Sequence, residues 1–144
     1  MISTRGRYAL RMMVDLAQHR GEGFISLKDI ANRQDISKKY LEQIIPMLNR
    51  ASLLHTSRGF AGGYQLTKAP KDYTVGEILR AMEGSLAPVA CLEGTTNTCP
   101  RCAECATLFV WEGLYKVQTA YLDSITLQDI LDRQEASSGQ NYSI

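Results

Sequence analysis

The chain has little of what membrane proteins, secreted proteins and most enzymes need. No apolar run approaches the roughly 20 residues that a membrane span requires. The first segment carries arginines and Asp15 within its apolar stretch and has no small-residue cleavage site, so we expect no signal peptide and a cytoplasmic protein. Neither histidine has a nucleophile partner in the pattern, and no phosphate-binding glycine motif is present. We therefore expect that the protein is not an enzyme.

The composition is that of an ordinary globular domain, with 44% hydrophobic and 22% charged residues. Its net charge of +1 hides an asymmetry. Residues 1–71 hold 12 Lys and Arg against 5 Asp and Glu, whereas residues 72–144 hold 4 against 10. The basic half is predicted to face a polyanion, although chance variation of a solvated surface would also explain the charge taken alone.

Three helices are expected in the first 50 residues. Apolar residues recur at helical spacing over residues 4–19, and two glycines follow as stop signals. Ser26 opens a capping box at the start of a short second helix, which ends near residue 33. Ser37 is a good N-cap for a third helix, in which Pro46 should kink or tighten the last turn. The buried face of this third helix is predicted to be Leu41, Ile44, Ile45 and Leu48.

A glycine-rich hairpin follows the third helix. Residues 53–56 and 64–67 are predicted strands, with residues 57–63 as the tip between them. Two short helices, a tight turn and then a hairpin are the element order of a winged helix. A second capping box at Thr74 opens a helix that stops at Gly84. The expected fold class is therefore mainly α with a small β-hairpin wing, a winged helix-turn-helix.

The second half contains a long loop and a long helix. Residues 85–105 hold all four cysteines, and a loop of that length is usually functional or mobile. Apolar residues then step at helical spacing over residues 106–124, a stripe that argues for a buried partner or equally for a core within the chain. A last short helix capped at Thr126 is expected to end near Arg133. The predicted regions are a winged helix (1–72), a linking helix and cysteine loop (73–105), the last two helices (106–135) and a flexible tail (136–144).

A DNA-reading surface is predicted at the start of the third helix and on the wing. Gln43 can pair with adenine and Glu42 can accept from cytosine, although a solvated amphipathic helix explains these residues about as well. Arg58 on the wing tip favours the DNA-binding interpretation, because arginine commonly enters a narrow minor groove. Lys28 and Lys68 are expected to contact phosphate. The predicted DNA-binding residues are Arg7, Lys28, Ser37, Lys38, Lys39, Tyr40, Glu42, Gln43, Arg58, Gly59, Gly62, Gly63 and Tyr64.

Three segments carry a resemblance to a known family. Residues 3–9 (STRGRYA), 40–43 (YLEQ) and 58–64 (RGFAGGY) together resemble the Rrf2 family of bacterial transcription regulators, with its IscR-, NsrR- and CymR-like branches. The resemblance covers essentially the whole chain. It implies a regulator, in the first instance a repressor, that forms a homodimer through the helix at 106–124. It further implies that two winged helices bind a palindromic operator in double-stranded DNA. No membrane partner is expected.

The cysteines have the spacing C-x7-C-x2-C-x2-C, at Cys91, Cys99, Cys102 and Cys105. Thiolates this close can converge on one soft metal centre. The spacing leaves open an iron-sulfur cluster, zinc, or redox-active thiols without a metal. The resemblance favours a cluster, [2Fe-2S] or [4Fe-4S], because cluster-binding members carry three cysteines that match positions 91, 99 and 105.

The chain departs from the family pattern at the fourth ligand. IscR-like members carry a histidine three residues after the last cysteine, where this chain has Leu108. NsrR-like members use an acidic residue near the N-terminus, where this chain has Arg7 and Tyr8. Cys102 is the additional thiol and the candidate replacement. An all-thiolate site would favour a more negative reduction potential than a histidine-ligated one.

Two other functions remain open at this point. CymR-like members lack the loop cysteines and act through a complex with cysteine synthase, whose active site accepts a C-terminal isoleucine. The present chain ends in Tyr142, Ser143 and Ile144, so a partner-binding tail at Tyr142 and Ile144 is an alternative. A ferredoxin-like electron carrier would use the same cysteines but would leave the recognition helix, wing and basic half unexplained. The leading expectation is therefore a regulator whose DNA affinity is set by the cysteine loop.

Overall fold

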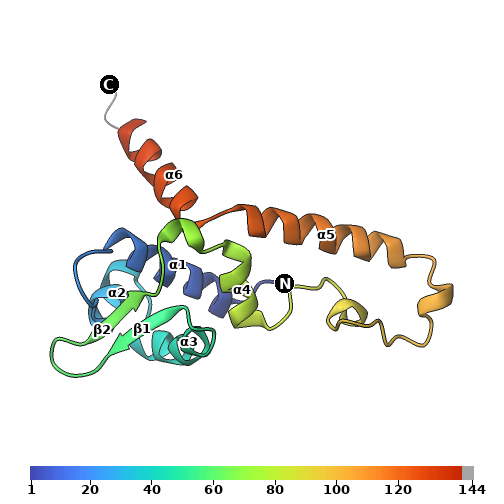
Figure 1. Cartoon of the computed structure of the whole chain (residues 1–144), viewed down its shortest axis with the longest axis horizontal. Helices are drawn as coiled ribbons and strands as arrows, with labels where there is room; N and C mark the ends of the chain where they lie inside the picture. The colour runs from blue at the N-terminus through green and yellow to red at the C-terminus, as the bar shows by residue number, and fades with distance from the viewer. Residues whose placement is uncertain (141–144) are drawn as a thin grey trace.

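In the computed structural model, which describes residues 1–140, helix α1 (Thr4–Gln18) runs through the middle of the N-terminal half (Figure 1). Its element order confirms the predicted mainly α fold with one small hairpin. The other elements are α2 (Leu27–Gln34), α3 (Lys38–Arg50), β1 (Leu54–Ser57), β2 (Gly63–Leu66), the 3-10 turn η1 (Pro70–Asp72), α4 (Val75–Glu83), the 3-10 turns η2 (Ala90–Leu92) and η3 (Cys102–Glu104), α5 (Leu108–Ser124) and α6 (Leu127–Gln140).

The predicted caps account for where the helices begin. The hydroxyls of Ser26, Ser37 and Thr74 each accept a hydrogen bond from the backbone N–H three residues later, at 3.1 Å. At Thr126 the capping is reciprocal, because Asp129 also accepts from the backbone N–H of Thr126 at 2.8 Å. Each bond satisfies a donor that the first helical turn leaves unpaired.

The hairpin pairs antiparallel, with Leu54 opposite Leu66 and Ser57 opposite Gly63. Each strand lies within one residue of its predicted bounds. Ile25 forms an isolated antiparallel bridge to the hairpin, because it exchanges two backbone hydrogen bonds with Tyr64, at 3.0 and 2.9 Å. The segment before α2 is thereby attached to the wing.

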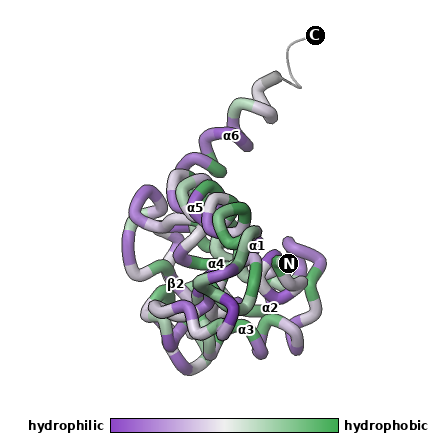
Figure 2. Tube along the Cα trace, turned by 90° about the vertical axis from the view of Figure 1, so that its right-hand side faces the viewer, coloured by the Kyte–Doolittle hydropathy of each residue, from purple (hydrophilic) through white to green (hydrophobic). Residues whose placement is uncertain are grey.

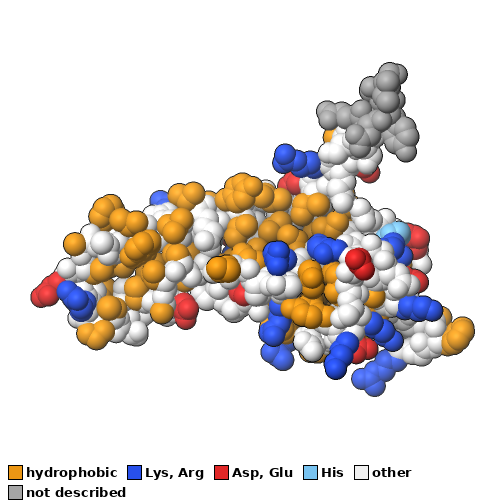
Figure 3. Space-filling model, turned by 180° about the vertical axis from the view of Figure 1, so that it is seen from behind, with side chains coloured by type: hydrophobic (Ala, Val, Ile, Leu, Met, Phe, Trp, Pro, Cys, Tyr) orange, Lys and Arg blue, Asp and Glu red, His pale blue; other side chains and the backbone are white. Residues whose placement is uncertain are grey.

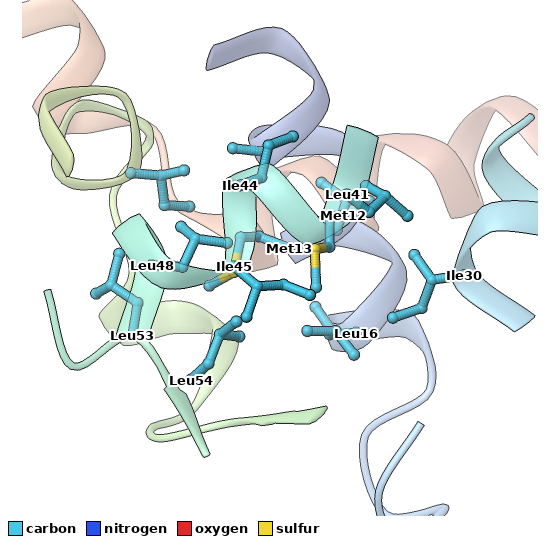
Figure 4. Packing of buried hydrophobic residues seen from close by; sticks show 14 of the residues in the cluster. Met12, Met13, Leu16, Ile30, Leu41, Ile44, Ile45, Leu48, Leu53 and Leu54 are labelled. Atoms are coloured by element: carbon cyan, nitrogen blue, oxygen red, sulfur yellow. The ribbon is translucent and has the colours of Figure 1, made fainter. Parts of the chain in front are cut away.

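The hydrophobic core lies where α1 meets α2, α3 and the root of the hairpin (Figure 4). The predicted buried face of α3 is confirmed, and α3 continues past the exposed Pro46 to Arg50. Residues from every element of the winged helix point into this cluster, including Met12, Met13, Leu16, Ile30, Leu41, Ile44, Ile45, Leu48, Leu53 and Leu54.

One charged side chain is fully buried among the described residues, that of Asp15. Its carboxylate accepts two hydrogen bonds from the Arg33 guanidinium, at 2.7 and 3.0 Å, and one from the side-chain amide of Gln34 at 2.9 Å. The hydrogen bond with Asp15 raises the pKa of Arg33, and the nearby negative charge of Asp15 acts in the same direction. The bidentate pair therefore ties the C-terminal end of α2 to α1.

Tyr73 joins the wing to the second half. It is fully buried, and its hydroxyl donates to the carbonyl of Leu53 at 2.8 Å while accepting from the backbone N–H of Thr67 at 2.7 Å. Its own carbonyl accepts from the N–H of Leu127 at 3.1 Å. One residue thus holds both strand ends of the wing and the start of α6.

Helix α5 extends away from the N-terminal half, with the cysteine-containing segment at its far end (Figure 1). Helix α6 continues to Gln140, so the prediction that the last helix ends near Arg133 was wrong. The hydroxyls of Ser137 and Ser138 donate to carbonyls four residues earlier, at 3.0 Å each, so these polar groups are paired within the helix. The tail residues Tyr142 and Ile144 lie outside the described residues. No described helix combines the length and apolar character needed to cross a membrane.

Candidate nucleic-acid interface and cysteine loop

The first turns of α3 present an exposed polar surface. Ser37, Lys38, Lys39, Glu42 and Gln43 are all exposed, while the intervening Leu41 is buried in the core. We call these five residues the recognition face. Tyr40 differs from them, because it is half-buried and its ring lies edge-on to that of Tyr8, with ring centroids 5.2 Å apart.

Helix α1 fixes the start of α3 through contacts that sequence reasoning missed. The Arg11 guanidinium lies over the Tyr8 ring, 5.4 Å from its centroid, and donates a hydrogen bond to the backbone carbonyl of Gln34. Arg11 therefore contacts the end of α2 and the aromatic pair that includes Tyr40. The sequence feature that could have predicted these contacts is the helical spacing of Tyr8 and Arg11, which places them on one face of α1.

The wing owes its glycines mainly to its own packing. A Cβ on Gly63 would overlap the backbone carbonyl of Ile25, and one on Gly62 would overlap that of Ser57. Gly59 is exposed with φ of 103°, a left-handed conformation that favours glycine. The sequence analysis lists these glycines as DNA-binding residues, which stays a prediction, and Gly62 and Gly63 have in addition a structural reason within the hairpin. Arg58 is exposed beside them.

The root of the wing packs against α3, the helix that carries the recognition face. The hydroxyl of Thr56 on β1 donates a hydrogen bond to the side-chain carbonyl of Asn49 on α3 at 3.2 Å, and Leu54 joins Leu48 in the hydrophobic core. Tyr64 on β2 is half-buried, and burial raises the pKa of its hydroxyl, with a further rise from the negative charge of Glu42. The wing is thereby attached to the helix whose first turns form the recognition face.

The remaining cationic residues predicted to contact DNA are either exposed to solvent or paired with another residue of the protein. Arg7 and Lys28 are exposed, and Arg7 donates to the hydroxyl of Thr4 at 3.1 Å. Lys68 instead forms an ion pair with Glu77 at 2.9 Å and lies over the Tyr73 ring, so it is engaged with the protein. Lys and Arg side chains gather along the lower edge of the N-terminal half, whereas hydrophobic side chains cover much of the elongated half (Figure 3).

The four cysteines lie between α4 and α5 as free thiols, of which Cys105 is the most exposed. A hydrogen bond from the Thr107 hydroxyl lowers the pKa of Cys105, and backbone N–H groups at the start of α5 act in the same direction. Within residues 1–140, no three His, Cys, Asp or Glu side chains lie close enough together to hold a metal ion.

The donor set nevertheless suits a soft metal. Four thiols in a stretch of 15 residues, Cys91 to Cys105, offer the ligand type that iron-sulfur clusters and zinc prefer. The thiolate form that binds metal is favoured at Cys105. The chemistry of the donors therefore fits such a group, but the backbone between Cys91 and Cys105 would have to close around it.

Both ends of this segment, the cysteine loop (residues 85–105), are attached to the long helix. The carbonyl of Leu86 accepts a hydrogen bond from the Gln118 side chain of α5 at 2.5 Å, and Leu86 packs with Val75 and Leu79 of α4. At the other end, Cys105 contacts Thr107 and leads directly into α5. A change in loop conformation would therefore act on the junction between α4 and α5.

Helix α5 has no buried residue. Its inner side, with Tyr115 and Leu122, packs against the small cluster of Val75, Leu79 and Leu86. Figure 2 views the helix nearly end-on and shows that its turns are rich in hydrophobic residues. The outer apolar stripe consists of Val110, Leu114, Val117 and Tyr121, which are 43% to 68% exposed. An intrachain core therefore does not account for this stripe.

Comparisons with known proteins agree on one family. A family model named Rrf2, described as an iron-dependent transcriptional regulator, matches residues 2–133. The protein rrf2 of Nitratidesulfovibrio vulgaris is 42% identical over 130 residues, which cover 90% of this chain and 86% of that protein.

Two solved structures are similar over nearly their whole length. The structure of CymR, the global cysteine regulator of B. subtilis, has a TM-score of 0.75 at 36% identity and covers 92% of this chain and 97% of that one. The structure of T. potens IscR has a TM-score of 0.75 at 42% identity and covers 95% of this chain and 90% of that one. The family model and the CymR structure are both described as regulators, and none of these relatives is named as an enzyme.

The recognition face generates a first prediction. Gln43→Ala should lower affinity for the preferred operator by about tenfold and relax base preference, because a bidentate base contact contributes about 1–3 kcal/mol of discrimination. The control Lys28→Ala should weaken all sequences equally and reduce the salt dependence by about one counterion. Both are measured by fluorescence anisotropy on duplexes selected from a random pool. An unchanged sequence preference for Gln43→Ala would show that the face is misassigned.

Proposed function

The chain belongs to the Rrf2 family and is a DNA-binding transcriptional regulator, and we propose that it represses transcription as a homodimer whose DNA affinity is set by its cysteine loop. The observation that supports the DNA-binding surface is the exposed recognition face of α3, with a wing that carries Arg58 attached to the same helix. In this arrangement α3 enters the major groove, where Glu42 and Gln43 meet base edges and Lys38 and Lys39 meet guanine or phosphate.

The other predicted contacts position the protein on the duplex. Arg58 enters the adjacent minor groove, whose negative potential attracts its guanidinium. Arg7 and Lys28 neutralise phosphates, and Ser37, Tyr40, Gly59 and Tyr64 line the surface between helix and wing. Each protomer reads one half of a palindromic operator, since a two-fold dimer presents two identical surfaces.

The homodimer is proposed on the outer stripe of α5. Val117 and Tyr121 are 68% and 64% exposed, in a helix whose opposite side already contacts its own chain. An apolar stripe of this length on a soluble regulator is the usual mark of a protein interface. A second copy of α5 is the partner with matching chemistry, because a two-fold interface brings the same stripe from both chains.

We propose an iron-sulfur cluster, of either the [2Fe-2S] or the [4Fe-4S] type, as the group that the cysteine loop takes up. Cys91, Cys99 and Cys105 would hold it, with Cys102 as the fourth donor, and the bound group would supply sensitivity to iron supply or oxidation. The protein residues around the loop would transmit its change in conformation to α5. Leu86 and Gln118 fasten the loop to α5, so that a change in the loop shifts the population of dimers that can bind DNA.

The dimer proposal is tested on α5. Val117→Glu should raise the dimer dissociation constant by about 100-fold, because an unpaired carboxylate at an interface centre costs about 3 kcal/mol. Lys116→Glu places the same side chain one position away, outside the apolar stripe, and should leave the dimer intact. Sedimentation equilibrium measures both. Equal effects of the two variants would contradict the assignment of the stripe.

The cluster proposal predicts colour and a regulatory effect. Protein purified without oxygen should show visible absorption with iron and sulfide in equal amounts, and Cys91→Ala/Cys99→Ala/Cys105→Ala should lose both. Operator affinity should change with the cluster, because the closed loop acts on the α4–α5 junction. Zinc in place of iron, or a colourless protein with reversible thiol oxidation, would each replace the cluster with another sensor. A triple variant with unchanged colour and DNA binding would exclude the cysteine loop as the sensor.

A second candidate function follows from the likeness to the structure of CymR, which is described as a global cysteine regulator. In that function Tyr142 and Ile144 are captured by cysteine synthase, because an apolar side chain next to a terminal carboxylate suits a carboxylate-binding pocket. Deleting Ile144 should then abolish the complex and leave operator binding unchanged. Titration of the synthase with a peptide of residues 135–144 measures the contact directly. No binding and no competition with an amino-acid substrate would remove this candidate.

A further inference from the structure

The tip of the wing carries an aromatic side chain in open solvent. The N–H of Gly62 donates to the carbonyl of Gly59 at 3.0 Å, which closes a turn with Phe60 and Ala61 at its two central positions. Phe60 is fully exposed, more so than any apolar residue of the α5 stripe. It belongs to neither hydrophobic cluster of the described residues. A large apolar surface in this position is unfavourable in water unless a partner covers it.

The hairpin holds Phe60 outward. The strands pair as far as Ser57 and Gly63, immediately below the tip. Gly62 and Gly63 pack so closely on backbone atoms of Ser57 and Ile25 that no side chain fits there. The neck of the wing is therefore a tightly packed backbone structure that presents the turn away from the body.

The surroundings of Phe60 favour DNA as its partner. The segment from Ser57 to Gly63 contains Arg58 and no acidic residue. The root of the same hairpin is attached to α3, because the Thr56 hydroxyl donates to the Asn49 side chain at 3.2 Å. When α3 occupies the major groove, the tip is thus directed toward the neighbouring minor groove. The walls of that groove are deoxyribose rings, which offer apolar surface between rims of phosphate.

We propose that Phe60 is a minor-groove wedge that packs against deoxyribose and the edge of a base step while Arg58 engages the negative potential of the groove. Aromatic and aliphatic side chains inserted in this way partly unstack a step, which is easiest at flexible pyrimidine–purine steps. Phe60 therefore adds a preference for deformable sequence at the outer ends of the operator, where no side chain reads a base by hydrogen bonding. This inference rests on the DNA surface proposed above.

The test compares Phe60→Ala with Phe60→Leu, which keeps an apolar wedge, and with Phe24→Ala, which removes an exposed phenylalanine outside the tip. The probes are the operator duplex selected by the full-length protein from a random pool and a derivative with a stiff A-tract at the step that the wing protects from hydroxyl radicals. Phe60→Ala should weaken operator binding by about tenfold, lose the outer minor-groove protection and bind both duplexes equally. Phe60→Leu and Phe24→Ala should retain the preference for the flexible step.

Unchanged affinity and footprint for Phe60→Ala would overturn the proposal and leave the tip to a protein partner. Loss of the step preference in Phe24→Ala as well would also overturn it, because the effect would not belong to the tip. Gln43→Ala and Arg58→Ala are measured in parallel. If these two also bind normally, the proposed DNA surface itself has failed, whereas a defect in them with a normal Phe60→Ala isolates the failure to the wedge. Thermal unfolding should be the same for all variants of the exposed tip.

Discussion

The paired carboxylate of Asp15 sets the geometry on which the DNA-binding half depends. Because Asp15 is fully buried, leaving it without partners would cost about 3 kcal/mol or more. Arg33 and Gln34, at the end of α2, satisfy it. That requirement fixes the end of α2 on α1 just before the chain turns at Asp35, which adopts a left-handed conformation with φ of 52°. Helix α3 starts three residues after Asp35. The Asp15–Arg33 ion pair therefore helps to set the direction in which α3 leaves α2.

The two halves of the chain meet at Tyr73 and at the α4–α5 junction. Tyr73 connects the strand ends of the wing to α6, and Arg80 of α4 pairs with Asp123 of α5 at 2.7 Å. A Cβ on Gly76 would overlap the Asp123 carboxylate, so close packing accompanies this pair. In the regulation proposed above, a change in the cysteine loop would reach the proposed DNA-binding surface through these contacts.

Sequence reasoning predicted the helices well where amphipathic spacing and a capping residue coincide. The hydroxyls of Ser26, Ser37 and Thr74 are suited to accept a hydrogen bond from an unpaired backbone N–H at a helix start, and each residue is found there. It failed for residues 134–140, because serine and glycine suggest a coil, whereas the hydroxyls of Ser137 and Ser138 bond to carbonyls within the same helix. Local propensity alone does not show which backbone group a serine side chain takes as its partner.

The candidate site was predictable in its residue types more than in its geometry. The exposure of Gln43 and Glu42 follows from the period of α3, since their apolar neighbours must face the core. The engagement of Lys68 with Glu77 and the packing of Gly63 on Ile25 depend on contacts between distant segments, which spacing does not encode. The arrangement of the four thiols is of the same kind, because a loop whose regular structure is limited to two short 3-10 turns has no longer period from which to infer it.

Helix α5 is attached to the body near its C-terminal end, where Ile125 accepts a backbone hydrogen bond from Val75 at 2.8 Å, while its first turns stand beside the cysteine loop. Its 17 residues make a rigid rod about 25 Å long. A rotation of about 8° at the junction would displace the cysteine-loop end of this rod by about 3.5 Å relative to the winged helix. In a dimer built on α5, a shift of that size, roughly one base-pair step, would change how the two winged helices are placed relative to one another. A motion too small to alter either fold would thus change whether two recognition helices match the spacing of their half-sites.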